Sequence, residues 1–174
     1  MSETDASHKD ANALLNAAMT YARELLRKEG EFSPFGVTLD VHDRLEIEAS
    51  RDGGDDAQLL DTLRQALLEK AGRSELRAAA MAVNVEARAQ VEGGFQDAVR
   101  VEIEHQGGYC AVIVVPYRLS GGGLGGLLPR KVEFGKTMSR PEKNWLWPPQ
   151  TSDSGESFQG SDVGLKIGPA GESE

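Results

Sequence analysis

The most constraining feature of this sequence is a short run, residues 109–117, in which both alternating sets of side chains are apolar. Such a run is far too short to cross a bilayer as a helix. As a β-strand it presents apolar side chains to both faces of its sheet, and both faces then need to be covered by other elements. The run therefore predicts a central strand of a sheet that carries packed elements on its two sides.

The spacing of apolar residues elsewhere predicts two helices and a set of shorter strands. A repeat of three to four residues marks an amphipathic helix, and a strict alternation marks a strand with one buried face. In chain order, the predicted elements other than the central strand are a helix at 12–29, a hairpin formed by 35–41 and 45–50, a helix at 56–71, strands at 79–91 and 99–104, and an edge strand at 130–138.

These elements together predict an α+β fold, with two helices and a mostly antiparallel sheet of five or six strands in the order α-β-β-α-β-β-β(-β). We expect the central strand to lie between the first hairpin and the strand at 99–104. We also expect a flexible N-terminus at residues 1–10 and a single domain at 11–147. Residues 148–174 are rich in Ser, Gly, Asp, Glu and Pro, a composition that predicts a disordered acidic tail.

Charge and cysteine content narrow the classes of function. The net charge is −9, of which residues 1–12 carry −2 and residues 148–174 carry −4. An acidic chain with no concentrated positive field is a poor ligand for phosphate backbones, so we expect no nucleic-acid binding. Cys110 is the only cysteine and the sequence shows no secretion signal or membrane-spanning run, which together favour the cytoplasm.

Three short segments carry a resemblance to other proteins. They are Phe-Ser-Pro-Phe-Gly at 32–36, Ala-Val-Arg-Val-Glu-Ile-Glu-His at 98–105 and Val-Pro-Tyr at 115–117, preceded by a leading helix. With these features, residues 9–147 resemble a group of small bacterial proteins that have no assigned activity. The resemblance implies a bacterial single-domain protein and adds no chemistry. At the level of the fold, the order of elements also resembles roadblock and profilin-like domains, and a fold does not carry a function.

Two glycine motifs superficially suggest a nucleotide site. Gly121, Gly123 and Gly126 have the G-x-G-x-x-G spacing of a dinucleotide loop, but that loop must open a helix, and an alternating, strand-like stretch follows here. Gly135-Lys-Thr mimics the end of a phosphate-binding loop. That loop also needs a glycine five residues before Gly135, and this position is occupied by Arg130. We therefore interpret the first motif as a hairpin loop and the second as a strand end, and expect no cofactor.

The histidines and the cysteine offer no local catalytic or metal-binding spacing. His8 lies near the N-terminus, His42 in the predicted hairpin turn, and His105 at the end of a strand, and no two of them are spaced as metal ligands on one element. Cys110 lies in the most apolar strand, where a thiol is usually structural. We expect no catalytic and no metal-binding residue among them, although the fold could bring His105 close to His42.

Carboxylates recur at alternating positions on two strands, as Glu46 with Glu48 and Glu102 with Glu104. A pair on one face could in principle perform acid–base chemistry. Solvated strand faces with cross-strand ion pairs, for which Arg88 and Arg100 are placed, account for the same pattern. We therefore expect these side chains to be structural.

A basic segment precedes a pair of tryptophans near the end of the predicted domain. Residues 118–143 carry a net charge of +4, and tryptophan is enriched at protein–protein contacts. The segment could bind an acidic partner, including the acidic tail of the same chain, or its charges could protect a sheet edge from aggregation. The candidate partner surface consists of Arg130, Lys131, Trp145 and Trp147.

Three functions remain open from the sequence. The first is a non-enzymatic interaction or accessory domain with an unknown protein partner, which includes self-association. The second is an enzyme whose site is assembled from scattered residues such as His105 and Cys110, and a cleft that holds His105 beside a carboxylate with a perturbed pKa would favour it. The third is an immunity-type protein that inhibits a toxin, suggested by small size and acidity.

Overall fold

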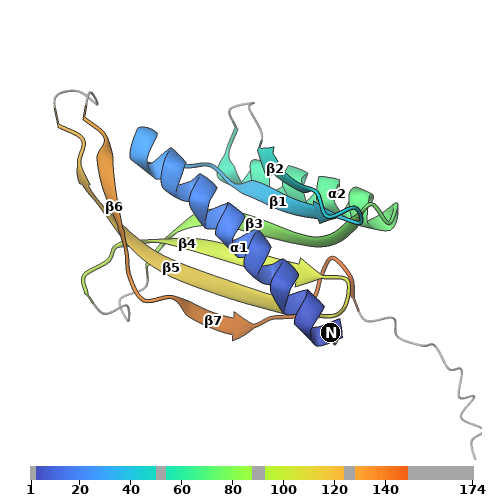
Figure 1. Ribbon diagram of the computed structural model, residues 1–174. Helices are drawn as coiled ribbons and strands as arrows, with labels where there is room; N and C mark the ends of the chain where they lie inside the picture. The colour runs from blue at the N-terminus through green and yellow to red at the C-terminus, as the bar shows by residue number, and fades with distance from the viewer. Residues whose placement is uncertain (1–2, 50–53, 88–92, 124–127, 149–174) are drawn as a thin grey trace, which may run out of the picture.

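The computed structural model describes residues 3–49, 54–87, 93–123 and 128–148. It contains a seven-stranded antiparallel sheet with a helix on each face (Figure 1). The predicted α+β class is confirmed, as are the two helices and their place in the element order. The elements are α1 (Glu3–Lys28), β1 (Phe35–Asp40), β2 (Leu45–Ala49), α2 (Asp56–Gly72), β3 (Leu76–Glu86), β4 (Asp97–His105), β5 (Cys110–Gly121), β6 (Arg130–Phe134) and β7 (Met138–Pro141).

The strands follow the order β2-β1-β3-β4-β5-β6, and β7 also pairs with β5. The expected place of the central strand beside the hairpin was wrong, because β3 lies there instead. The alanines of β3 are buried on both sides of the sheet, so two helices can approach this strand closely. The run at 109–117 is nevertheless interior, since β5 has β4 on one side and both β6 and β7 on the other.

The edge strand expected at 130–138 is in fact two short strands. β6 pairs with the last third of β5, from Tyr117 to Gly121, and β7 pairs with its first part, from Ala111 to Val114. Between them, the Gly135 N–H still donates to the Pro116 carbonyl at 2.7 Å. The two strands therefore follow one edge of β5 with a break between them.

Helix α1 lies diagonally across one face of the sheet and covers the larger core (Figure 1). It begins at Glu3 rather than at residue 12, so residues 3–10, which were expected to form a flexible N-terminus, are helical. The sequence pattern missed this first part because it is held by polar contacts, and both Ser7 and Asp10 are buried. The fully buried part of this core comprises Leu14, Ala18, Ala22, Leu26, Val37, Ala78, Ala82, Val99, Val101 and Ile103.

Helix α2 and the segment after β7 cover part of the opposite face. Leu67 of α2 packs with Leu76, Ala79 and Met81 of β3, and Leu146 completes this second core. Residues 149–174, which make up nearly all of the predicted tail, lie outside the described residues. Neither helix in the part of the chain that the structure describes has the length and apolar character of a membrane span.

Candidate functional site

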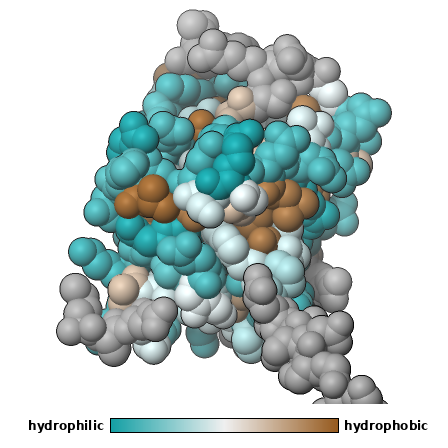
Figure 2. Space-filling view, turned by 90° about the vertical axis from the view of Figure 1, so that its right-hand side faces the viewer, coloured by the Kyte–Doolittle hydropathy of each residue, from teal (hydrophilic) through white to brown (hydrophobic). Residues whose placement is uncertain are grey.

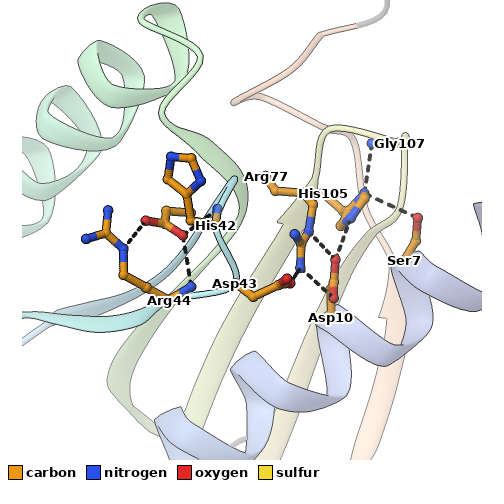
Figure 3. A network of polar contacts seen from close by, with 9 residues as sticks. Ser7, Asp10, His42, Asp43, Arg44, Arg77, His105 and Gly107 are labelled. Atoms are coloured by element: carbon orange, nitrogen blue, oxygen red, sulfur yellow. Dashed lines mark hydrogen bonds and ion pairs between the residues drawn. The ribbon is translucent and has the colours of Figure 1, made fainter.

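A network of polar side chains joins the start of α1 to the start of β3 and the end of β4, and it includes His105 (Figure 3). The Gly107 N–H donates to His105 Nδ1 at 2.8 Å, and Ser7 Oγ lies 3.2 Å from the same nitrogen. On the other side of the ring, Nε2 is 3.1 Å from Asp10 Oδ2. Since Nδ1 accepts from a backbone amide, the ring proton is on Nε2 and is donated to Asp10.

Asp10 is also held by an arginine from β3. Arg77 donates to both carboxylate oxygens of Asp10, through Nε at 2.7 Å and Nη2 at 3.1 Å, and Nη2 reaches Asp43 at 2.6 Å. Burial alone would raise the pKa of Asp10, but the hydrogen bonds from Arg77 and His105 outweigh it and hold the pKa below 3.8. Asp10 is therefore an ionised anchor between helix and sheet.

This network borders a cavity of about 740 Å³. Figure 2 views the molecule from the side at which α1 begins, where hydrophilic side chains surround separate apolar patches. The cavity brings together His105, a residue of the enzyme hypothesis, and Trp147, a residue of the candidate partner surface. Its lining residues are Ala6, Lys9, Asp10, Asp43, Arg77, His105, Gln106, Gly107 and Trp147.

A cavity that holds His105 beside a carboxylate with a shifted pKa is the arrangement expected to favour an enzyme. Ser7, His105 and Asp10 even form a hydroxyl–imidazole–carboxylate chain. However, Ser7 is only 4% exposed and His105 only 5%, which leaves no room for a substrate beside the hydroxyl. The Nδ1 lone pair would have to accept the proton of the Ser7 hydroxyl. It already accepts a hydrogen bond from the Gly107 N–H. The geometry therefore favours a structural anchor over a nucleophilic site.

The other histidines and the cysteine stay outside this network. The imidazole of His42 points away from His105 in Figure 3, and its backbone N–H donates to Asp40. His8 Nδ1 is 2.8 Å from the Thr4 carbonyl on the surface of α1. Burial and nearby carboxylates raise the pKa of Cys110 to about 12, so its thiol stays protonated at neutral pH.

Three of the four paired carboxylates have structural partners. Glu48 pairs with Lys70 of α2, and Glu102 pairs with Arg100 on its own strand. Arg88, the other expected cation, lies outside the described residues. Glu104 is 2% exposed, and its Oε2 accepts the backbone N–H groups of Trp145 at 3.1 Å and Leu146 at 2.7 Å.

The tryptophan pair thus contributes to the fold, and Trp147 also lines the cavity at His105. Glu104 and the buried Leu146 fasten this segment to the second face of the sheet, and Trp145 and Trp147 are partly buried there. Burial raises the pKa of Glu104 above 4.5, while the N–H groups of Leu146 and Trp145 oppose the shift. A buried carboxylate that receives backbone donors from a distant segment is not recognisable from sequence alternation.

Arg130 and Lys131 lie beside a second cavity, of about 590 Å³, between α1 and β6. Two further arginines of α1, Arg23 and Arg27, line it and were not predicted. Its apolar floor is formed by Pro129, Val132 and Phe134. No acidic side chain is among these lining residues, so the cavity is a basic pocket on an acidic protein. We call it the basic pocket below.

The arginines of the basic pocket differ in how far other contacts within the protein hold them. Arg23 and Arg27 are exposed, and the guanidinium of Arg23 lies 5.0 Å from the centre of the Phe134 ring. Arg130 is committed to the fold, since its Nη1 donates to the Lys28 carbonyl at 3.0 Å and caps the end of α1. A Cβ at Gly30, which has a φ of +87°, would come within 2.9 Å of Arg130 Nε, so glycine makes room for this cap.

The element that follows Gly121 and Gly123 among the described residues is the strand β6, so the helix needed by a dinucleotide loop is missing there, and Gly126 lies outside the described residues. Within the described ranges, no group of three His, Cys, Asp or Glu side chains is arranged to hold a metal ion. No known family model, curated protein or solved structure matches this chain.

Proposed function

We propose that this protein is a non-enzymatic interaction domain of the bacterial cytoplasm, and that it binds an acidic segment of a partner protein at the basic pocket. The observation that carries the proposal is the convergence of Arg23 and Arg27 with Arg130 on an apolar floor that no carboxylate lines. Like charges repel one another, so cations gathered without a carboxylate in the lining are stabilised by an anionic ligand. Arginine binds carboxylates through two parallel hydrogen bonds, which suits an acidic peptide.

The ion pairs of the surrounding surface support the same choice. Arg118 is neutralised by Glu133, and Arg140 lies beside Glu142. Among the described side chains Arg27 forms no ion pair, and its nearby carboxylate Glu24, whose pKa is lowered chiefly by Lys28 and also by Arg27, is paired with Lys28. The charge of Arg27, and that of Arg23 stacked on Phe134, are available to a ligand whose carboxylates approach from solvent. The apolar floor would add contact area for the side chains between those carboxylates.

The test is a titration with a synthetic glutamate-rich peptide, followed by fluorescence anisotropy. Arg27→Glu should weaken binding by about tenfold or more, because one attractive ion pair is replaced by a repulsion. Arg73→Glu is the matched control, since Arg73 is an exposed arginine remote from the pocket lining and paired with Glu75. Binding should also fall as salt is raised. Equal affinity of the two variants, or no binding by the native protein, would contradict the proposal.

A second candidate is an esterase-type enzyme at the His105 cavity, favoured by the Ser7–His105–Asp10 chain. Its probe is the hydrolysis of p-nitrophenyl acetate. An enzyme would lose turnover in both Ser7→Ala and His105→Gln. If the native protein and both variants hydrolyse the ester at the same background rate, the interaction domain remains the better proposal.

A further inference from the structure

The outer edge of β6 presents unpaired backbone groups beside the basic pocket. β6 is the last strand in the sheet order, and in the described part of the chain it pairs only with β5. The Gly135 N–H points to β5, and ladder bonds alternate along an antiparallel strand. The backbone groups of Glu133 and Lys131 therefore bond to β5, whereas those of Arg130, Val132 and Phe134 face away from the sheet.

The face of this edge toward α1 is cationic, whereas the opposite face carries Lys131 together with Glu133, which pairs with Arg118. Val132 and Phe134 face α1, so a strand laid beside β6 would pass next to Arg23 and Arg27 on that face. Lys131 alternates with them and belongs to the opposite face. Neighbouring strands lie about 4.8 Å apart, which is well within the reach of these long side chains.

The opposite edge of the sheet has the reverse character. β2 is the first strand in the order, and its exposed side chains include Glu46 together with Leu45 and Ile47. An acidic strand would be repelled there and attracted to β6. Charge thus distinguishes the two edges, although both have free backbone groups.

We infer that the acidic partner segment binds as an additional β-strand along the outer edge of β6. This inference rests on the proposed function and names its mode of binding. The backbone of the segment pairs with Arg130, Val132 and Phe134, and its alternating carboxylates meet Arg23 and Arg27 on the α1 face. Main-chain bonds then provide affinity and the cations select an acidic sequence.

Two N-methylated peptides test this mode. The probe is a short synthetic peptide that alternates glutamate with valine, so that its two faces differ. One version is methylated on the backbone nitrogens of the glutamates and the other on those of the valines. Only one alternating set of N–H groups in a strand can face β6, so one peptide should bind about tenfold or more weakly than the other.

Amide hydrogen exchange of the full chain gives an independent readout. The N–H groups of Val132 and Phe134 should become protected when the unmethylated peptide is bound, and the outward-facing N–H of Ile47 on the β2 edge should not. Peptide binding that depends on Arg27 but treats both methylated peptides alike, with no new protection in β6, would overturn strand addition and leave the proposed function standing. Absence of binding by any acidic peptide would overturn both.

The main competing explanation of the basic edge also makes a distinct prediction. If the cations only keep sheet edges of neighbouring copies apart, Lys131→Ala should self-associate and no peptide should protect β6. If Lys131→Ala stays monomeric and binds the peptide more weakly, the edge is a binding surface. Sedimentation velocity of the variant, with and without peptide, separates the two results.

Discussion

Replacing Asp10 by alanine should destabilise the protein by about 2–3 kcal/mol. The change removes two hydrogen bonds from Arg77 and leaves the Nε2 proton of His105, a side chain that is 5% exposed, without its acceptor. A hydrogen bond to a charged group contributes about 1.5–3 kcal/mol, and an unsatisfied buried donor costs about 1–3 kcal/mol. Arg77 keeps Asp43 and the cluster borders a cavity, so the two-pronged Arg77–Asp10 contact is counted once, at about 1.5 kcal/mol, and the unsatisfied donor at about 1 kcal/mol.

The assay is urea denaturation at neutral and acidic pH, with Asp61→Ala as the control. Asp61 is an exposed carboxylate of α2. The pKa of Asp10 is lowered in the folded state, so its stabilising effect is present above the unfolded value of 3.8 and is lost as pH falls through the folded-state pKa. The difference between the native protein and Asp10→Ala should therefore shrink in acid. If Asp10→Ala costs no more than Asp61→Ala at neutral pH, the start of α1 is not anchored and our account of the network is wrong.

Four further outcomes follow from burial and charge. Val112→Asp should cost at least about 3 kcal/mol in a urea titration, because a side chain that is 1% exposed would become charged; near-native stability would contradict an interior β5. Glu104→Gln should flatten the pH profile of stability, since the raised pKa of Glu104 destabilises the native protein as pH rises through that pKa; an unchanged profile would contradict this. Cys110 should react with a disulfide reagent at neutral pH far more slowly than a free thiol, given a pKa of about 12. Removing residues 148–174 should leave the melting temperature unchanged, and a drop of several degrees would show that they stabilise the domain.

The candidate site was less predictable than the fold. Arg130 and Lys131 were identified from local charge, but Arg23 and Arg27 join them only because α1 crosses the sheet near β6. On the helix alone, those two arginines are ordinary solvent-facing residues. Trp145 and Trp147 were expected to form a partner surface, and the structure shows them partly buried against the sheet; a tryptophan that packs on a sheet and one that binds a partner look the same in sequence.

What the sequence determined by itself is the fold class and most of the elements, although it merged β6 and β7 into one strand and missed the first turns of α1. Periodicity is a local property, so the spacing of apolar residues in α2, the β1–β2 hairpin and β5 was sufficient to place them. Only the tertiary structure decided which strands are neighbours, how far α1 extends toward the N-terminus, and which side chains meet. Strand order depends on contacts between residues far apart in the chain, as in the pairing of β1 with β3. The first turns of α1 are fixed by Asp10, Arg77 and His105, whose hydrogen bonds leave no periodic signal, because each comes from a different element.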